Sequence, residues 1–386
     1  MRSLFGVMVA ILLVQSSFAG EPPRARDLGI RFDGSPGPFN AITDVEGVTV
    51  GHHTVVEDLP NGRSARTGVT AVLPLGRATL MQPVFGAWFS LNGCGEMTGT
   101  TWIEESGQLD GPVMLTNTHS VGSVHEATIA WRIQQGGSDA SGYFWSTPVV
   151  AETWDGPLNN VNGFYVTPAH VASALESAKS GAVTEGNVGA GTGVVCYEFK
   201  CGIGTASRVV KVLGETFTLG VLVQANHGAR DELRISGVPV GRYVATDQTD
   251  ETFTAGGGKN SSIIIVVATD APLLPHQLKR VVKRAALGLA RTGAVAHNGS
   301  GDIFVAFSTA ERSLGRVDRV LSHRSVPNEV IDPLFTATVQ ATEEAIVNAL
   351  VAARDITGDQ GNYAKALPHD ELMEILQRYS RSAARD

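Results

Sequence analysis

The stretch from residue 256 to residue 270 constrains the fold of this chain more than any other. Its second half, residues 263–268, is an unbroken run of isoleucine, valine and alanine. Such a run, rich in β-branched residues, predicts a strand buried on both faces of a sheet. Its first half is a glycine loop that contains Lys259 and Asn260. The change from loop to strand falls at Ser262, so this serine is expected at the start of a central strand.

The position of Ser262 also suggests a chemical role. If the peptide bond after Ser261 were cut, Ser262 would carry both a hydroxyl and a free α-amine. A free α-amine has a pKa of about 7.7–8.0, close to what a general base needs at neutral pH, and a hydroxyl nucleophile requires such a base. The alternative is an ordinary surface loop that leads into a core strand, because serine is common in such turns.

A second block of sequence favours the chemical interpretation. Residues 298–308 place Ser300 and Asp302 two positions apart before another apolar run. Together the two blocks resemble the DmpA-type aminopeptidases, a family of self-cleaving serine hydrolases with L-aminopeptidase D-esterase/D-amidase and β-peptidyl aminopeptidase members. The resemblance covers nearly the whole chain after its leader, and further blocks occur in the family's order at residues 26–29, 41–48, 66–71, 95–100, 102–107, 117–122, 202–208 and 268–272.

The resemblance implies an α/β (α+β) fold, an αββα four-layer sandwich of the N-terminal-nucleophile type. It implies a cut between Ser261 and Ser262, because the family's nucleophile directly precedes five apolar residues; a cut after Asn260 is the alternative register. The products would be a large fragment, residues 20–261, and a small fragment, residues 262–386, which together form one catalytic domain. The polar segment 229–261 has the composition of a mobile linker that leads to such a cut.

Three residues besides Ser262 are candidates for catalysis. By resemblance, Ser300 and Asp302 would orient the nucleophile or its amine, and some relatives have a glutamate where this chain has Asp302. Asn226 ends a predicted strand over residues 218–225, and a side-chain amide at a strand end can stabilise a developing oxyanion. The alternative role for Asn226 is to stabilise a turn.

Candidates for substrate binding come from charge and from the resemblance. Glu96, Glu104 and Glu105 lie in a segment rich in glycine and aromatic residues, where a carboxylate could hold a substrate's free ammonium; a solvated surface is the alternative. The resembled family has a tyrosine that contacts the reacting group, and the nearest match here is Trp154, which has no hydroxyl. The substrate would be a short peptide, or an amino-acid amide or ester. Its L-, D- or β-configuration stays open.

Residues 1–19 have the pattern of a signal peptide, with Arg2 before an apolar run and small residues before a cleavage site after Ala19. We therefore expect an exported protein, periplasmic or secreted, with no membrane attachment once the signal is removed. Buried free thiols are the expectation for Cys94, Cys196 and Cys201, and a Cys196–Cys201 disulfide is the alternative. The formal charge of −8 argues against nucleic acid as a partner.

No zinc-ligand or cofactor motif accompanies these blocks, so the reaction is expected to need neither metal nor cofactor. Two other functions stay open at this point. One is a binding or scaffold homologue that never cuts itself. The other is an acetyl-group transferase of the ornithine type, although such enzymes usually use a threonine where this chain has the Ser261–Ser262 junction. The resemblance also implies a homo-oligomer of processed heterodimers, a tetramer.

Overall fold

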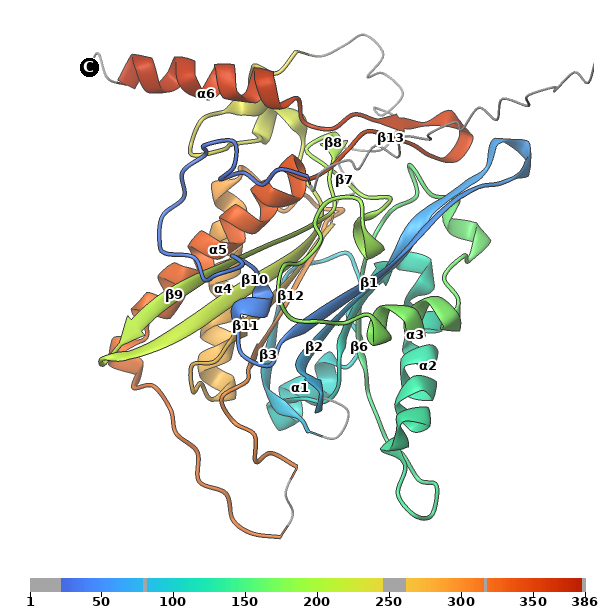
Figure 1. The fold of residues 1–386 in the computed structure, drawn as a ribbon, viewed down its shortest axis with the longest axis vertical. Helices are drawn as coiled ribbons and strands as arrows, with labels where there is room; N and C mark the ends of the chain where they lie inside the picture. Colours follow the sequence, from blue (N-terminus) through green and yellow to red (C-terminus); the bar gives the residue numbers. More distant parts are fainter. Residues whose placement is uncertain (1–21, 79–81, 246–261, 316–317, 384–386) are drawn as a thin grey trace, which may run out of the picture.

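Two β-sheets stacked face to face form the centre of the molecule (Figure 1). The computed structural model describes residues 22–78, 82–245, 262–315 and 318–383. The larger sheet has six strands, in spatial order β4 (Gln108–Leu109), β3 (Val84–Gly93), β12 (Gly301–Ser308), β11 (Ser262–Thr269), β10 (Glu215–Asn226) and β9 (Ile203–Val212). The smaller sheet has four, in the order β1 (Thr49–Asp58), β2 (Ser64–Arg77), β5 (Val113–Asn117) and β6 (Val149–Thr153).

Helices cover the outer face of each sheet (Figure 1). The helices α4 (Pro275–Arg291) and α5 (Asp332–Val351) pack on the six-stranded sheet, and α2 (Val121–Arg132) and α3 (Pro168–Glu176) pack on the four-stranded sheet. The layer order is therefore αββα, as the family resemblance implies. None of the helices in the described part of the chain is long and apolar enough to cross a membrane.

The remaining elements are short or lie at the ends of the sandwich. The helices α1 (Thr100–Ser106) and α6 (His369–Ala383) lie at opposite ends in Figure 1. Two small hairpins are formed by β7 (Val195–Cys196) with β8 (Phe199–Lys200) and by β13 (Ile356–Thr357) with β14 (Tyr363–Ala364). Connections contain 3-10 helices at Ile42–Asp44, Pro60–Gly62, Thr118–Ser120, Val161–Gly163, Gly189–Gly191, Arg230–Glu232, Val240–Arg242, Asn328–Val330 and Asp359–Gly361, and a π-helical turn at Ile133–Gly137.

The strand β11 lies at the centre of both apolar layers. Ile264 and Val266 face the four-stranded sheet and belong to the core between the sheets. Ile263 and Ile265 alternate with them and belong to the core beneath α4 and α5. Every residue of β11 is buried, because β10 and β12 pair with its two edges and other layers cover both faces. The predicted central strand over residues 263–268 is confirmed.

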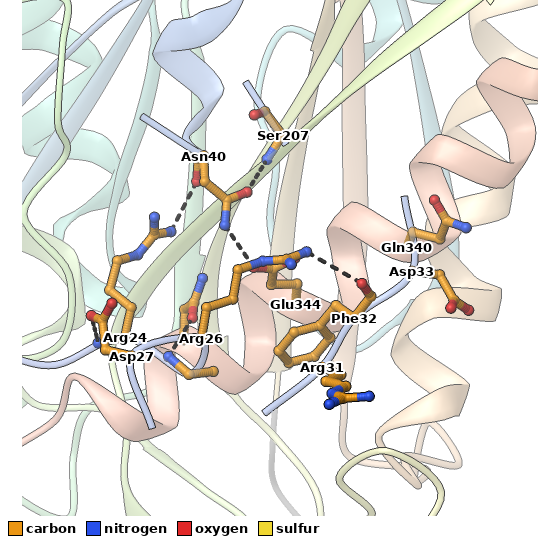
Figure 2. Close-up of polar contacts among 12 residues, drawn as sticks. Arg24, Arg26, Asp27, Arg31, Phe32, Asp33, Asn40, Ser207, Gln340 and Glu344 are labelled. Carbon is orange, nitrogen blue, oxygen red and sulfur yellow. Dashed lines mark hydrogen bonds and ion pairs between the residues drawn. The ribbon is translucent and has the colours of Figure 1, made fainter. Parts of the chain in front are cut away.

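An N-terminal arm, residues 22–40, is fixed to β9 and α5 by charged side chains (Figure 2). Arg26 Nε and Arg208 Nη2 pair with the Glu344 carboxylate at 2.6 and 2.7 Å. Asn40 Nδ2 donates to the same carboxylate at 2.6 Å. Several donors thus compensate for the burial of Glu344, which a single partner seldom achieves. Because Glu344 belongs to the predicted small fragment and the arm to the large one, this cluster joins the two.

Part of the predicted linker is packed structure. Residues 229–245 contain the 3-10 helices Arg230–Glu232 and Val240–Arg242, and Leu233, Ile235 and Val240 are fully buried. These apolar side chains hold an otherwise polar segment against the core. The prediction of a mobile linker is therefore wrong for residues 229–245. Residues 246–261, with the predicted cut at Ser261, and the predicted signal peptide lie outside the described residues.

The cysteines also differ from the expectation. Cys196 and Cys201 form a disulfide with a Cα–Cα distance of 5.4 Å, and the free thiol of Cys94 is exposed. The expectation of buried free thiols is therefore wrong. The hairpin of β7 and β8 explains the pairing, because Tyr197 and Glu198 both adopt positive φ and reverse the chain. Cysteine spacing alone does not reveal such a reversal.

Candidate active site

Ser262 is the first residue of β11, and the ends of three strands meet around it. In the antiparallel pair of β10 and β11 it lies opposite Asn226, the last residue of β10. In the parallel pair of β11 and β12 it lies opposite Gly301, the first residue of β12. The strand register therefore brings together the candidate nucleophile, the candidate oxyanion donor and the block that contains Ser300 and Asp302.

The backbone of β12 holds the hydroxyl of Ser262. Gly301 N–H donates to Ser262 Oγ at 3.1 Å, and the serine is only 5 % exposed. A side chain at position 301 would collide with its surroundings, because a Cβ there would lie 2.6 Å from the Cys94 carbonyl oxygen and 2.9 Å from Gly95 Cα. The absence of a side chain lets these backbones approach closely enough to fix Ser262 Oγ at the end of the sheet.

Ser300 and Asp302 form a buried polar pair beside Ser262. Ser300 Oγ donates to Asp302 Oδ1 at 2.6 Å, and both side chains are 1 % exposed. Burial raises the pKa of the Asp302 carboxyl to about 6, although the Ser300 hydroxyl and the Ile263 backbone N–H oppose this rise. The register of β12 against β3 shifts between Asp302 and Ile303, and irregularities of this kind re-aim side chains next to active sites. Asp302 lies opposite Ile263, the residue after Ser262, in the pair of β11 and β12, so the Ser300–Asp302 pair places an ionisable group near the candidate nucleophile.

Asn226 presents a side-chain amide at the same end of the sheet. Its Oδ1 accepts a hydrogen bond from Val195 N–H at 2.9 Å. This bond assigns the orientation of the amide, because Nδ2 is then the atom that can donate on the opposite side. Directly opposed residues of an antiparallel pair point to the same face, so Asn226 and Ser262 share one face. The predicted oxyanion role of Asn226 needs this arrangement, and it stays a prediction.

Glu152 is a functional candidate that the sequence analysis missed. It lies on β6 and is 3 % exposed; its Oε1 accepts from Glu96 N–H at 3.0 Å and its Oε2 accepts from Thr118 Oγ1. A Cβ added to Gly95 would lie 3.1 Å from both Glu152 Oε1 and Gly301 Cα. The carboxylate therefore lies just across Gly95 from the backbone that holds Ser262.

The environment of Glu152 is unusual for a carboxylate. Burial raises its pKa, against the hydrogen bonds from Thr118 and the Glu96 backbone. No arginine or lysine pairs with it in the described part of the chain. The available sequence signal is a glutamate inside the apolar segment 148–153, because carboxylates are rarely buried unless a partner or a function requires it.

Comparisons with known proteins identify the family that carries this site. A family model described as peptidase family S58 matches residues 40–364, which is most of the chain. The chain belongs to peptidase family S58. Relatives in this family and solved structures of the same fold match nearly the whole chain.

Two β-aminopeptidases and one L-aminopeptidase illustrate the relationship. The chain is 50 % identical over 394 residues to the beta-peptidyl aminopeptidase BapA of Sphingosinicella microcystinivorans, with 98 % of each protein covered. It is 48 % identical to the L-aminopeptidase D-Ala-esterase/amidase of Ochrobactrum anthropi, a prototype of the serine aminopeptidases with a variant Ntn hydrolase fold, at a TM-score of 0.86 over 93 % of this chain and 99 % of that chain. A Burkholderia sp. beta-aminopeptidase matches at 44 % identity and a TM-score of 0.82 over 92 % of this chain and 99 % of that chain.

The predicted resemblance and the predicted fold are confirmed, and this family S58 peptidase is a hydrolase of the aminopeptidase class. The comparisons favour that function over the scaffold and the ornithine-type acetyltransferase. They do not assign roles to individual residues, so the predicted roles of Ser262, Ser300 and Asp302 rest on the geometry above.

The three predicted substrate-binding glutamates of this family S58 peptidase lie in different places. Glu96 is at the site through its backbone, which bonds to Glu152, while its side chain is exposed. Glu104 pairs with Lys279 on α4 at 2.5 Å, and Glu105 is exposed. Glu104 and Glu105 lie on α1, which Gly107 caps. The Gly107 carbonyl accepts from Gly86 N–H near the start of β3, whereas β3 pairs with Gly301 at its other end. The grouping of Glu104 and Glu105 with the substrate pocket is therefore corrected.

Trp154 lies beside Glu152 and forms part of an aromatic cluster. Its ring meets the ring of His119 edge-on, with centroids 5.6 Å apart. The ring of Phe164 stacks on His119 with centroids 6.0 Å apart, and Phe164 is largely exposed. Thr118, which bonds to Glu152, precedes His119 in the chain. The cluster offers an apolar surface next to the buried carboxylate, and a substrate contact by Trp154 stays a prediction.

Proposed function

We propose that this chain cuts itself before Ser262 and then releases N-terminal residues from short peptides, amino-acid amides and esters through an acyl-enzyme on that serine. The observation that carries the proposal is the position of Ser262 at the first residue of a central strand. Gly301 N–H holds its hydroxyl, Asn226 ends the neighbouring strand β10, and the Ser300–Asp302 pair lies at the start of β12. These neighbours supply the donors and the ionisable group that nucleophilic catalysis needs.

The self-cleavage is an N-to-O acyl shift followed by hydrolysis. Ser262 Oγ attacks the carbonyl carbon of Ser261, and the hydroxyl proton passes to the Ser262 nitrogen as the C–N bond breaks. The resulting ester is hydrolysed by water, which leaves a carboxylate on Ser261 and a free α-amine on Ser262. Asn226 Nδ2 stabilises the oxyanion in both steps.

After the cut, the α-amine of Ser262 serves as the general base. It removes the hydroxyl proton while Oγ attacks the substrate carbonyl, and it then returns this proton to the leaving nitrogen or oxygen. The same amine activates the water that hydrolyses the acyl-enzyme. A pKa of about 7.7–8.0 suits this work. Asp302, ionised above about pH 6, orients the Ser300 hydroxyl and through it the amine.

Glu152 accounts for the requirement for a free N-terminus. A buried carboxylate is costly unless a cation joins it, and the ammonium of an aminopeptidase substrate is such a cation. The position of Glu152, across Gly95 from Gly301, supports an ammonium subsite next to the carbonyl that Ser262 attacks. A blocked amine would leave Glu152 unpaired, so an acylated substrate should bind poorly.

An exported location and a homo-oligomer of cut heterodimers complete the proposal. The signal-like residues 1–19 support export, and the Cys196–Cys201 disulfide is of the kind that persists in oxidising compartments. The oligomer is supported by the resemblance alone, and light scattering of the purified protein tests it. Sequencing the N-terminus of the large fragment tests signal removal, with a start at Gly20 expected.

The function is tested with a panel of amide substrates. L-, D- and β-amino-acid p-nitroanilides are each prepared with a free and an acetylated amine. The proposal predicts turnover of one or more free-amine substrates, no turnover of their acetylated forms, and loss of activity in Ser262→Ala. Equal turnover of free and acetylated substrates would contradict the exopeptidase assignment.

A further inference from the structure

Lys200 is a fully buried lysine close to the candidate active site. It ends β8, and its side chain has no exposed surface. Within the described residues no carboxylate pairs with it. Its ammonium instead donates to the backbone carbonyls of Gly191 and Val194, both at 3.0 Å, and of Cys201. Burial lowers the pKa of Lys200, whereas the three carbonyl acceptors oppose this by stabilising the charged ammonium.

An apolar side chain would fill this space at a smaller cost in desolvation. The three carbonyls therefore explain why a lysine occupies this position, because an ammonium has three donors and here meets three acceptors. Gly191 and Val194 flank the turn that runs from the 3-10 helix Gly189–Gly191 into β7. Lys200 thus fixes the conformation of this turn from inside.

One peptide group connects Lys200 to the candidate active site. The carbonyl of the Val194–Val195 peptide accepts from Lys200 Nζ at 3.0 Å, and the N–H of the same peptide donates to Asn226 Oδ1 at 2.9 Å. A peptide group is planar and rigid, so an orientation imposed on its carbonyl is imposed on its N–H. A cation on the carbonyl also polarises the N–H and strengthens the second bond.

Asn226 depends on that second bond for its orientation. A side-chain amide rotated by half a turn exchanges its oxygen and its nitrogen. With Oδ1 on Val195 N–H, Nδ2 is the atom left to donate to an oxyanion; with the amide rotated, a carbonyl oxygen would take its place and repel the developing charge. We propose that Lys200 is a positioning residue for catalysis, which acts through the Val194–Val195 peptide to hold the Asn226 amide with its nitrogen towards the oxyanion. This inference rests on the proposed oxyanion role of Asn226.

The hairpin that carries Lys200 is fastened to the same strand end. Tyr197 N–H donates to the carbonyl of His227, the residue after Asn226, at 2.7 Å. The Cys196–Cys201 disulfide closes the hairpin around its two-residue turn. The backbone N–H of Lys200 also donates to the Lys365 carbonyl at 2.7 Å. These anchors keep the ammonium in place relative to Asn226.

A double-mutant cycle separates this role from a purely structural one. The four proteins are the wild type, Lys200→Met, Asn226→Ala and the double variant, assayed for kcat and KM on a free-amine p-nitroanilide per cut chain. Asn226→Ala should lower kcat by about 10²–10³-fold, as removal of an oxyanion donor does. Lys200→Met should lower kcat by about tenfold with KM unchanged, since it disturbs the same transition-state interaction. In the Asn226→Ala background Lys200→Met should cause no further loss.

Thr192→Val is the matched control. It removes the hydrogen bond from Thr192 Oγ1 to the Gly189 carbonyl in the same turn but leaves the Val194–Val195 peptide untouched, so kcat should stay at the wild-type value. If Lys200→Met does not fold, Lys200→Gln, which keeps two N–H donors, replaces it in the cycle. If a variant cuts itself too slowly to be assayed as the processed enzyme, the rate of its self-cleavage replaces kcat, because the same oxyanion donor serves both reactions.

The possible outcomes are distinct. Losses that multiply in the double variant, or an equal loss in Thr192→Val, would overturn the positioning role while leaving the peptidase function intact. Wild-type kcat in Asn226→Ala would overturn it as well, because the amide would then have no catalytic role. If Ser262→Ala hydrolysed the substrate as fast as the wild type, the proposed function itself would be refuted.

Discussion

Asn226 and Ser262 lie directly opposite each other at the end of the antiparallel pair of β10 and β11. The first would belong to the large fragment and the second to the small one. Their relative position is set by a continuous ladder of strand pairing and does not depend on the peptide bond before Ser262. The proposed cut therefore frees an amine without disturbing the site, because β11 stays bound between β10 and β12.

The pH dependence of activity should contain two ionisations on its acidic side. Asp302 must be ionised, and burial raises its pKa to about 6; the Ser262 amine must be neutral, with a pKa of about 7.7–8.0. A plot of log kcat/KM against pH should therefore rise with a slope of two below pH 6 and of one between the two pKa values. In Asp302→Asn the slope should be one throughout, and a slope of two in this variant would exclude Asp302 as the second group.

The same carboxyl should lower the stability of the protein. A carboxyl with a raised pKa in the folded state costs stability once the pH rises above its unfolded pKa, and the full cost is reached above its folded pKa of about 6. Asp302→Asn should therefore raise the free energy of unfolding by about 1–3 kcal/mol at pH 7 and leave it unchanged below pH 4. Denaturant unfolding at the two pH values measures this, and equal stability at pH 7 would contradict the buried, ionised state of Asp302.

Glu152→Gln should impair the binding of substrates with a free amine. The amide keeps the size and the hydrogen-bond acceptor but removes the charge that attracts an ammonium, so kcat/KM should fall by about 10²-fold, a loss of roughly 3 kcal/mol. Steady-state kinetics with free and acetylated p-nitroanilides measure the effect. Glu105→Gln, an exposed glutamate on α1, is the control and should leave kcat/KM unchanged. A similar loss in both variants would place the ammonium elsewhere.

The Glu344 cluster should be important for stability. Glu344→Gln leaves Arg208, which is 1 % exposed, without its charge partner, and removal of one member of a buried ion pair costs about 3–5 kcal/mol. Burial raises the pKa of Glu344, but the hydrogen bond from Arg26 and the charge of Arg208 outweigh it and hold the pKa below its usual value. The stability that ionised Glu344 contributes is therefore present above the pKa of this carboxyl in the unfolded chain, and it is lost as the pH falls through the lower pKa of the folded state.

The neighbouring residue gives a matched control for this prediction. Glu343 lies on the same helix and pairs with the partly exposed Arg291 at 3.0 Å, so Glu343→Gln should change the free energy of unfolding by less than about 1 kcal/mol. Thermal and denaturant unfolding of the two variants decide the matter. Equal, small effects would mean that the arm in Figure 2 does not depend on Glu344 for its attachment.

Local sequence pattern predicted the central features of this fold well. The run at residues 263–268 is buried on both faces because β-branched apolar side chains suit a central strand. The placement of Ser262 follows from that run, and Asn226 was found because it ends the neighbouring strand. The block at Ser300 and Asp302 was found only through a resemblance, since the pairing of β11 with β12 is not visible in either segment alone.

Features that depend on contacts between distant segments were missed. Glu104 and Glu105 were grouped with Glu96 by proximity in sequence, although α1 carries them to the other end of β3. Glu152 reaches the site only because the four-stranded sheet packs on the six-stranded one. The link from Lys200 to Asn226 passes through a single peptide group, and the Cys196–Cys201 disulfide depends on a two-residue turn. No periodic pattern records such contacts.

The most direct test of the account is N-terminal sequencing of the small fragment of the purified protein, together with the variants Ser262→Ala and Ser261→Ala. We predict a fragment that begins at Ser262 in the wild type, the same cut in Ser261→Ala, and one intact, inactive chain in Ser262→Ala. A Ser262→Ala protein that is cut and hydrolyses amides at the wild-type rate, or full activity from an uncut wild-type chain, would contradict the account.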